Sequence, residues 1–220
     1  MNLDQYLAYP LAQIPYVLVA LILAFSIHEW AHAYVAYRFG DPTAKNQGRL
    51  TLNPAKHVEP LGLIMIFLLG FGWARPVPVN RFHFRQPRLA GILVSIAGPL
   101  SNLVLAFIFM MGWYFLDYVG WIDWFSDKNY NMAFQLFNMI IYLNVVLFIF
   151  NLLPLPPLDG YRILEDVVPP GTRAKMIQYE NYGVVIFLIL AITPLGNYVF
   201  PPIFHTAIPF VLNAMSSFFT

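Results

Sequence analysis

Two histidines and a glutamate in the first apolar stretch of the chain have the spacing of a metal-dependent hydrolytic site. They form the sequence His28-Glu29-Trp30-Ala31-His32. On a helix, residues i and i+4 lie on one face, so both imidazoles can reach one Zn²⁺ while Glu29 lies beside them as a proton acceptor for zinc-bound water. Apart from tyrosines, these three residues carry the only ionisable side chains between Leu11 and Tyr37. Ionisable groups inside an apolar span are costly and indicate function; the alternative is a polar cluster that links helices by hydrogen bonds.

A catalytic zinc usually has three protein ligands and one open position, so a third ligand is expected. Asp159 is the favoured candidate because it follows an apolar stretch that three prolines interrupt within residues 154–157. Such prolines free backbone groups and allow a carboxylate to turn inward. The alternative role for Asp159 is to cap a helix that begins at Gly160. The other histidines, which are weaker ligand candidates, are His57, His83 and His205.

The depth of these groups in a membrane supports Asp159. His28 lies 17 residues after Leu11, which is about 25 Å along a helix and places it near the inner side of a hydrocarbon core of roughly 30 Å. The apolar stretch that ends at Leu153 is expected to reach the same side. The two histidines and Asp159 are therefore predicted to share one depth, toward the cytosol.

The composition places the chain in a lipid bilayer. Hydrophobic residues make up 59% of the chain and charged residues 10%, with a mean hydropathy of +0.62; soluble proteins carry about 25% charged residues. A net charge of +1 argues against a nucleic-acid partner. The absence of cysteine excludes disulfides, thiolate ligands and a cysteine nucleophile. The N-terminus has no basic residue before the apolar stretch, so it is not expected to be a cleavable signal peptide.

Hydropathy predicts an all-α polytopic membrane protein with four main transmembrane helices. The four stretches are 11–37, 89–116, 132–153 and 182–200, the last interrupted near Pro194. A fifth stretch, 61–73, is short and has basic residues on both sides, so a re-entrant segment between the first two helices keeps both basic clusters inside. Alternating residues at 49–53 and 76–80 predict that this segment is β-hairpin-like. Residues 198–220 are expected to form a further span or an interfacial helix.

A peptide bond inside a transmembrane helix is protected, so a membrane substrate would have to unwind before cleavage. An exposed strand edge at 49–53 could pair with the unwound chain, and the side-chain amides of Asn102, Asn144 and Asn151 could hold its carbonyls. The alternative role of these asparagines, above all Asn102 and Asn144, is hydrogen bonding between helices.

The chain resembles the site-2 protease family of intramembrane zinc metalloproteases, in a short form without PDZ or nucleotide-sensing domains. The resemblance is carried by His28-Glu29-x-x-His32, by Gly98-Pro99-Leu100-Ser101-Asn102 and by Asn151-x-x-Pro154-x-x-x-x-Asp159-Gly160. It implies one Zn²⁺ per chain bound by His28, His32 and Asp159, with Glu29 as the catalytic base. It also implies hydrolysis of peptide bonds within or near transmembrane segments of substrate proteins, as in regulated intramembrane proteolysis.

The expected organisation is a single transmembrane metalloprotease domain, with a catalytic core at 11–160 and peripheral helices at 161–220. The expected location is a prokaryotic plasma membrane, with the active site toward the cytosol and with lipid and a transmembrane protein or peptide as partners. A metal transporter would need further ligands in the outer half of the first stretch, where residues 11–25 offer none beyond Gln13. A non-proteolytic zinc-binding scaffold would be expected to lack Glu29 or one of the ligands, and all are present.

Overall fold

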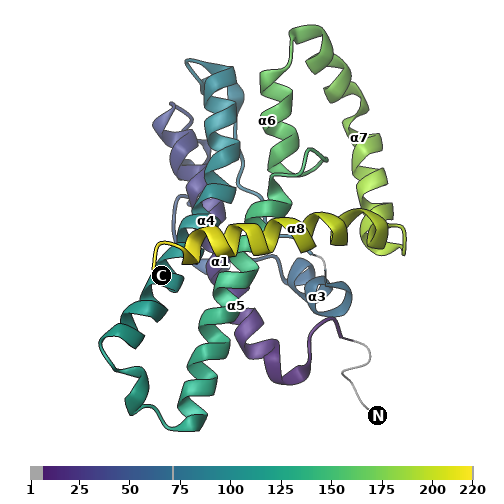
Figure 1. Ribbon diagram of the computed structural model, residues 1–220. Coiled ribbons are helices and arrows are strands. Elements are labelled where there is room, and N and C mark those ends of the chain that lie inside the picture. The colour runs from purple at the N-terminus through teal and green to yellow at the C-terminus, as the bar shows by residue number, and fades with distance from the viewer. Residues whose placement is uncertain (1–6, 71, 220) are drawn as a thin grey trace.

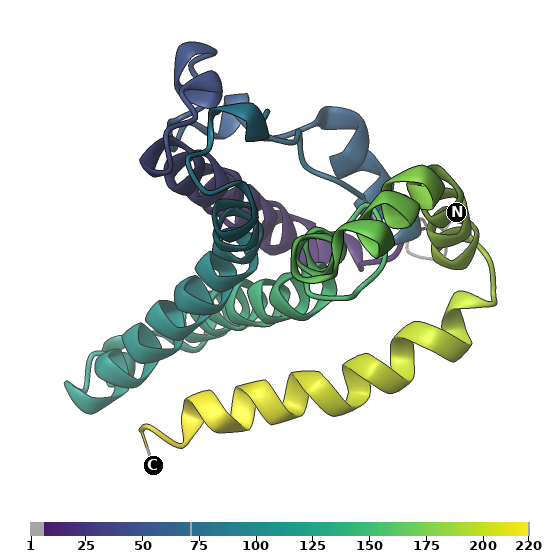
Figure 2. The same ribbon diagram turned by 90° about the horizontal axis from the view of Figure 1, so that it is seen from above.

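The protein is an all-helical bundle in the computed structural model, which describes residues 7–70 and 72–219. The long helices α1, α4 and α5 form its centre, and α7 and α8 lie at its side (Figures 1 and 2). The helices are η2 (Leu11–Gln13), α1 (Ile14–Arg38), α2 (Thr43–Asn46), η3 (Pro54–Lys56), α3 (Pro60–Leu69), η4 (Arg81–His83), α4 (Pro87–Tyr118), η5 (Ile122–Trp124), α5 (Asp127–Asn151), α6 (Asp159–Val167), α7 (Pro170–Ile192) and α8 (Gly196–Ser216).

Small residues allow α1 to pack closely against α4 and α5. Ala20, Ala24, Ala33 and Ala36 of α1 are fully buried. Small side chains let helix backbones approach, which is how helices associate where lipid removes the hydrophobic driving force between them. This close packing brings the middle of α1, with its two histidines, directly against α4.

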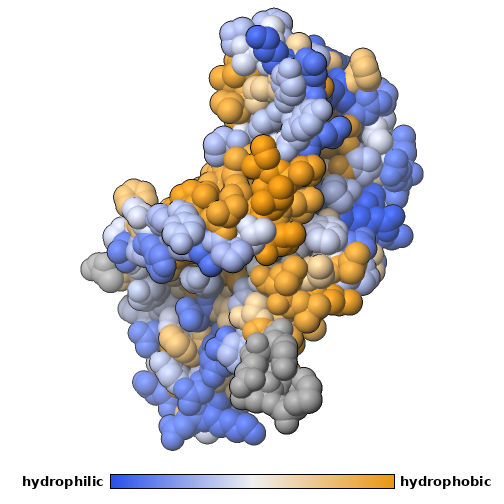
Figure 3. All heavy atoms as spheres, turned by 90° about the vertical axis from the view of Figure 1, so that its right-hand side faces the viewer, coloured by the Kyte–Doolittle hydropathy of each residue, from blue (hydrophilic) through white to orange (hydrophobic). Residues whose placement is uncertain are grey.

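Five helices in the described part of the chain are long and apolar enough to cross a membrane: α1 together with η2, α4, α5, α7 and α8. Hydrophobic atoms gather in a band between hydrophilic ends on the side of the molecule seen in Figure 3. The interruption predicted near Pro194 is present and divides the stretch 182–200 between two helices: α7 begins at Pro170 and ends at Ile192, and α8 follows from Gly196. The break has a local cause: Thr193 precedes Pro194 and is extended, as residues before proline usually are.

The predicted β-hairpin between the first two spans is also wrong. Neither 49–53 nor 76–80 forms a strand in the described chain. Pro76 and Pro78 have no N–H to donate, so this stretch makes isolated hydrogen bonds in place of a ladder. The segment instead contains α3, whose ten residues span about 15 Å and cannot cross a bilayer alone.

The chain nevertheless reverses direction after α3. Gly70 ends the helix at φ +72°, a conformation that favours glycine. The returning residues pack so closely that a Cβ on Gly62 would overlap the carbonyl oxygen of Trp73. From there residues 72–80 run back toward the start of α4 as an extended segment.

This topology makes a labelling prediction. The beginnings of α4 and α7 lie at one end of the bundle and the turn between α4 and α5 at the other (Figure 1). The chain has no cysteine, so single cysteines can be placed at the exposed positions Lys45, Arg85 and Lys175. All three should react with an impermeant thiol reagent from the same side of the membrane. The positive-inside tendency predicts that this side is the cytosol. A cysteine at Lys128 should react only from the other side. Labelling of the Arg85 position together with Lys128 would contradict the reversal after α3.

Candidate metal centre

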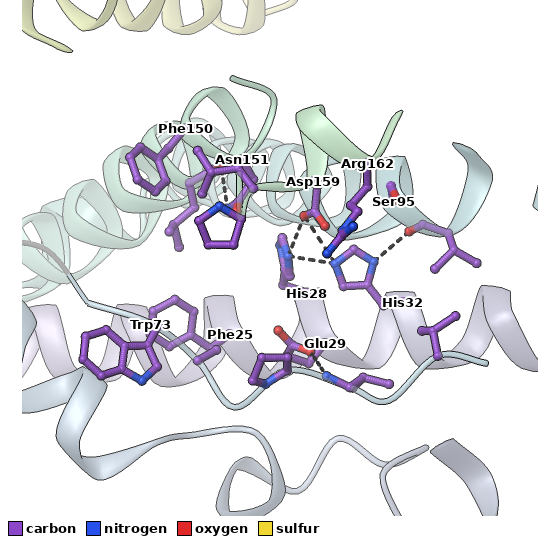
Figure 4. Close-up of a pocket in the computed structure, with 18 of the residues that line it drawn as sticks. Phe25, His28, Glu29, His32, Trp73, Ser95, Phe150, Asn151, Asp159 and Arg162 are labelled. Carbon is purple, nitrogen blue, oxygen red and sulfur yellow. Dashed lines mark hydrogen bonds and ion pairs between the residues drawn. The ribbon is translucent and has the colours of Figure 1, made fainter. Parts of the chain in front are cut away.

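His28, His32 and Asp159 meet at the centre of the bundle. The Nε2 atoms of the two histidines lie 3.0 Å apart, and Oδ2 of Asp159 lies 3.2 Å from that of His28 and 3.4 Å from that of His32 (Figure 4). Ligand atoms held 2.0–2.1 Å from a tetrahedral Zn²⁺ would be about 3.3 Å apart. The triangle formed by the three atoms therefore has the size of one face of a zinc coordination tetrahedron.

Hydrogen bonds on the far side of each imidazole fix which nitrogen is free. Nδ1 of His32 lies 2.7 Å from the carbonyl oxygen of Val94, which can only accept, so Nδ1 must donate. Nδ1 of His28 donates in the same way to Oδ1 of Asn102, at 2.6 Å. The Asn102 amide is oriented by its own donation to the carbonyl of Ala24 and to Oδ1 of Asn144. When both imidazoles are neutral, these bonds turn the lone pairs of both Nε2 atoms toward Asp159.

The three atoms that face one another, two imidazole nitrogens and one carboxylate oxygen, are all possible metal ligands. The side-chain atom Oδ2 of Asp159 is buried and receives no hydrogen bond, and Asp159 does not cap α6, whose N-cap is Leu158. Two imidazoles with one carboxylate are a ligand set of catalytic zinc sites. These residues therefore fit a zinc ion with one position left open.

Two glycines create the space for this approach. A Cβ on Gly98 of α4 would overlap the Nε2 atoms of both His28 and His32. A Cβ on Gly160 would overlap the carbonyl oxygen of Leu152 at the end of α5. Glycine at 98 allows α4 to lie against the histidines, and glycine at 160 allows the turn after α5 to carry Asp159 to them.

Glu29 lies beside the three candidate zinc ligands in the wall of a cavity of about 640 Å³. Its Oε2 accepts a hydrogen bond of 2.7 Å from the backbone N–H of Val77, in the extended segment that follows α3 (Figure 4). Apolar and aromatic side chains make up much of the cavity wall. The wall also contains the three candidate zinc ligands and two arginines, Arg81 and Arg162. Its principal lining residues are Phe25, His28, Glu29, His32, Trp73, Val77, Arg81, Leu147, Phe150, Asn151, Asp159, Arg162 and Phe187.

The extended segment is anchored beyond the cavity by Asp41, in the turn after α1. The Asp41 carboxylate is fully buried and accepts hydrogen bonds from the N–H of Asn80, from Thr43 and from His83. Burial by itself would raise the pKa of Asp41, but these hydrogen bonds outweigh it and hold the pKa below its usual value. Arg81 of the same segment forms an ion pair with Asp166 of α6.

The structure distributes the other sequence candidates differently. Asn102 and Asn144 are completely buried and their amides bond to other helices, the alternative considered for them from the sequence. Asn151 lines the cavity. His57 is buried near Thr51 and His83 pairs with Asp41, so neither is part of the cluster. The carbonyl of Val94 and the N–H of Val77 carry no side-chain signal that a sequence motif could reveal.

Replacing Asn102 should weaken zinc binding without removing a ligand. Asn102→Leu keeps the side-chain volume but removes the acceptor that orients His28, and loss of such an outer-shell partner typically costs about 10- to 100-fold in metal affinity. Competition against a chromophoric zinc chelator would measure the change. Asn138→Leu, at an exposed position of α5, is the matched control. Unchanged zinc affinity in Asn102→Leu would show that the hydrogen bond to His28 is unimportant.

Comparison with known proteins identifies the family. The sequence signature of peptidase family M50 matches residues 118–193. Two relatives carry the name "putative zinc metalloprotease": YwhC of Bacillus subtilis is 55% identical over 99% of this chain and 98% of its own length, and Rip2 of Mycolicibacterium smegmatis is 34% identical over 82% of this chain and 68% of its own length. No solved structure was found to match the chain. With helices able to cross a membrane and a site that fits zinc, the chain belongs to peptidase family M50, the site-2 protease family, and is a membrane zinc metalloprotease.

Proposed function

We propose that this protein hydrolyses peptide bonds within or near transmembrane segments of substrate proteins, as in regulated intramembrane proteolysis. In this proposal His28, His32 and Asp159 hold one Zn²⁺ and Glu29 is the general base. The observation that carries the proposal is the convergence of three buried acceptor atoms, 3.0–3.4 Å apart, in the wall of a cavity that Glu29 also lines. The name of the family supports the chemistry but does not specify the substrate.

The residues of this chain have separable tasks in that reaction. Bound zinc would act as a Lewis acid toward the scissile carbonyl and would lower the pKa of the attacking water toward about 7. Glu29 takes the proton of the attacking water and passes it to the leaving amine. The N–H of Val77 occupies Oε2 of Glu29, which leaves Oε1 to receive the proton. Asn102 and Val94 keep the imidazoles in the tautomer that binds metal.

The lining of the cavity supports a membrane segment as substrate. Its apolar side carries aromatic and aliphatic side chains from several helices, which suits hydrophobic residues of an unwound chain. The half-buried Asn151 lines the same cavity and uses Nδ2 to bond the carbonyl of Leu147, which leaves Oδ1 for a substrate N–H. We retain Asn151 as a candidate substrate-binding residue on this basis.

We also propose the division of the chain into a catalytic core at 11–160 and peripheral helices at 161–220. All four residues assigned to catalysis lie in the first part, and α7 and α8 are the least buried of the five long helices. The active site is proposed to face the cytosol, because the two histidines lie in the second half of α1 and basic residues follow that end of the helix.

A comparison of membrane-protein fragments tests the function. Cells expressing the wild-type chain should accumulate fragments whose new ends map within or near transmembrane segments, and cells expressing Glu29→Gln should not. Glu59→Gln, a glutamate outside the cavity, is the matched control and should behave as wild type. Identical fragments in the wild type and Glu29→Gln would exclude the proposed function.

A further inference from the structure

A buried arginine without a carboxylate partner lies next to the candidate site. Arg49 follows α2 and is 7% exposed. Its Nη2 donates to the carbonyl oxygen of Arg75 at 2.6 Å, and its buried Nε has no hydrogen-bond partner. None of the ion pairs formed by described residues includes it. A buried cation is costly unless other groups compensate it, so this arginine is expected to have a task.

The negative charge that Arg49 senses most strongly is Glu29. Burial lowers the pKa of Arg49, the carboxylate of Glu29 acts in the opposite direction, and the neighbouring Arg75 adds to the lowering. Arg49 and Glu29 are therefore electrostatic neighbours although no hydrogen bond joins them. Their connection runs through the backbone of the extended segment that follows α3.

That backbone links the two side chains by short hydrogen bonds. Both backbone polar groups of Arg75 are hydrogen-bonded: its carbonyl oxygen accepts from Arg49, and its N–H donates to the carbonyl of His57 at 2.8 Å. Two residues later, the N–H of Val77 donates to Oε2 of Glu29 at 2.7 Å. The residues on either side of Val77 are prolines, which have no N–H, so Val77 is the donor that this stretch can present to the carboxylate.

We propose that Arg49 is a positioning residue for proteolysis: by holding the carbonyl of Arg75, it keeps the N–H of Val77 against Glu29 and so fixes the direction in which the carboxylate faces the reacting water. Asp41 holds the other end of the same segment through Asn80, so the donor is fixed from both sides. The inference rests on the proposed role of Glu29 as the base. It assigns to Arg49 no contact with substrate or metal.

The first test separates positioning from folding. Arg49→Met keeps an unbranched apolar stem without a donor or charge, and misplacing a catalytic group in this way should lower kcat by about 10²-fold. KM for a quenched-fluorescent peptide that spans a cleavage site mapped in the fragment comparison should stay within about twofold, since substrate binding is untouched. Arg49→Lys, which retains the charge and a single donor nitrogen, should recover part of the rate, leaving a deficit of about tenfold. Both variants should hold one zinc per chain, and Arg85→Met is the exposed control.

The second test asks whether Arg49 acts through Glu29. When Glu29→Gln has already removed the base, adding Arg49→Met should change the residual rate by less than about threefold, because residues that act as a unit are strongly non-additive. A further loss of about 10²-fold in the double variant would overturn the proposal. Loss of zinc in Arg49→Met, or a wild-type kcat, would also overturn it.

These outcomes are distinct from failure of the proposed function. If Glu29→Gln alone retains wild-type turnover, the assignment of the base is wrong and the positioning role falls with it. If Glu29→Gln is inactive while Arg49→Met has a wild-type kcat, the base stands and only the role of Arg49 is excluded.

Discussion

Asp159→Ala is expected to lose zinc and proteolysis together. The carboxylate supplies one corner of the acceptor triangle, with Oδ2 at 3.2 and 3.4 Å from the two histidine nitrogens. Without it two imidazoles remain, whereas catalytic zinc sites usually hold the metal with three protein ligands. The loss of affinity should exceed the roughly 10- to 100-fold that removal of an outer-shell partner costs.

Metal analysis of the purified protein measures this directly. The wild type should contain one zinc per chain, and Asp159→Ala and a His28→Ala/His32→Ala double variant should contain close to none after dialysis against a weak chelator. Asp127→Ala, at the exposed start of α5, is the matched control and should retain the metal. Full zinc content in Asp159→Ala would place the third ligand elsewhere and would separate Asp159 from the site.

Glu29→Gln is expected to abolish turnover while zinc remains bound. The amide is nearly the same size and its oxygen can still accept the N–H of Val77, so the local structure should persist. It cannot take a proton from water, and removal of a general base costs about 10²- to 10⁴-fold in rate. The loss should appear in kcat, because the proton transfer belongs to the transition state and not to substrate binding.

Comparing Glu29→Gln with Asp159→Ala distinguishes the general base from a zinc ligand. The first should combine full zinc content with no activity, and the second should lose both. Near-normal turnover of the mapped peptide by Glu29→Gln would exclude Glu29 as the base. Loss of zinc in Glu29→Gln would instead make Glu29 part of the metal-binding set.

Local regularity made much of this protein predictable from its sequence. The four-residue spacing of His28 and His32 specifies a shared helical face, because the helical repeat alone places i and i+4 together. Long apolar stretches likewise specify helices, since a bilayer leaves the backbone no other hydrogen-bond partners. The residues themselves indicated zinc and favoured Asp159 as its third ligand, the resemblance carried by three motifs implied the same set, and the comparison with known proteins confirmed the family and the cofactor.

Sequence patterns failed where several elements compete for the same backbone groups. Alternation at 76–80 predicts a strand, yet the prolines there remove donors and the N–H of Val77 bonds to a glutamate 48 residues away. The apolar stretch 182–200 is predicted as one span interrupted near Pro194, but the extended Thr193 ends α7 there and α8 begins as a separate helix at Gly196. In both cases a nonlocal contact or a single backbone conformation overrides the average property of the stretch.

What only the tertiary structure decided is how distant residues complete the site. Asp159 reaches the histidines because Gly98 and Gly160 leave no side chain in the way. Asn102 orients His28 from another helix, 74 positions along the chain. Arg49 reaches Glu29 only through the backbone of a third segment. The sequence determines the type and local spacing of chemical groups, whereas their meeting depends on close helix packing, which is a property of the whole bundle and leaves no periodic signal in the chain.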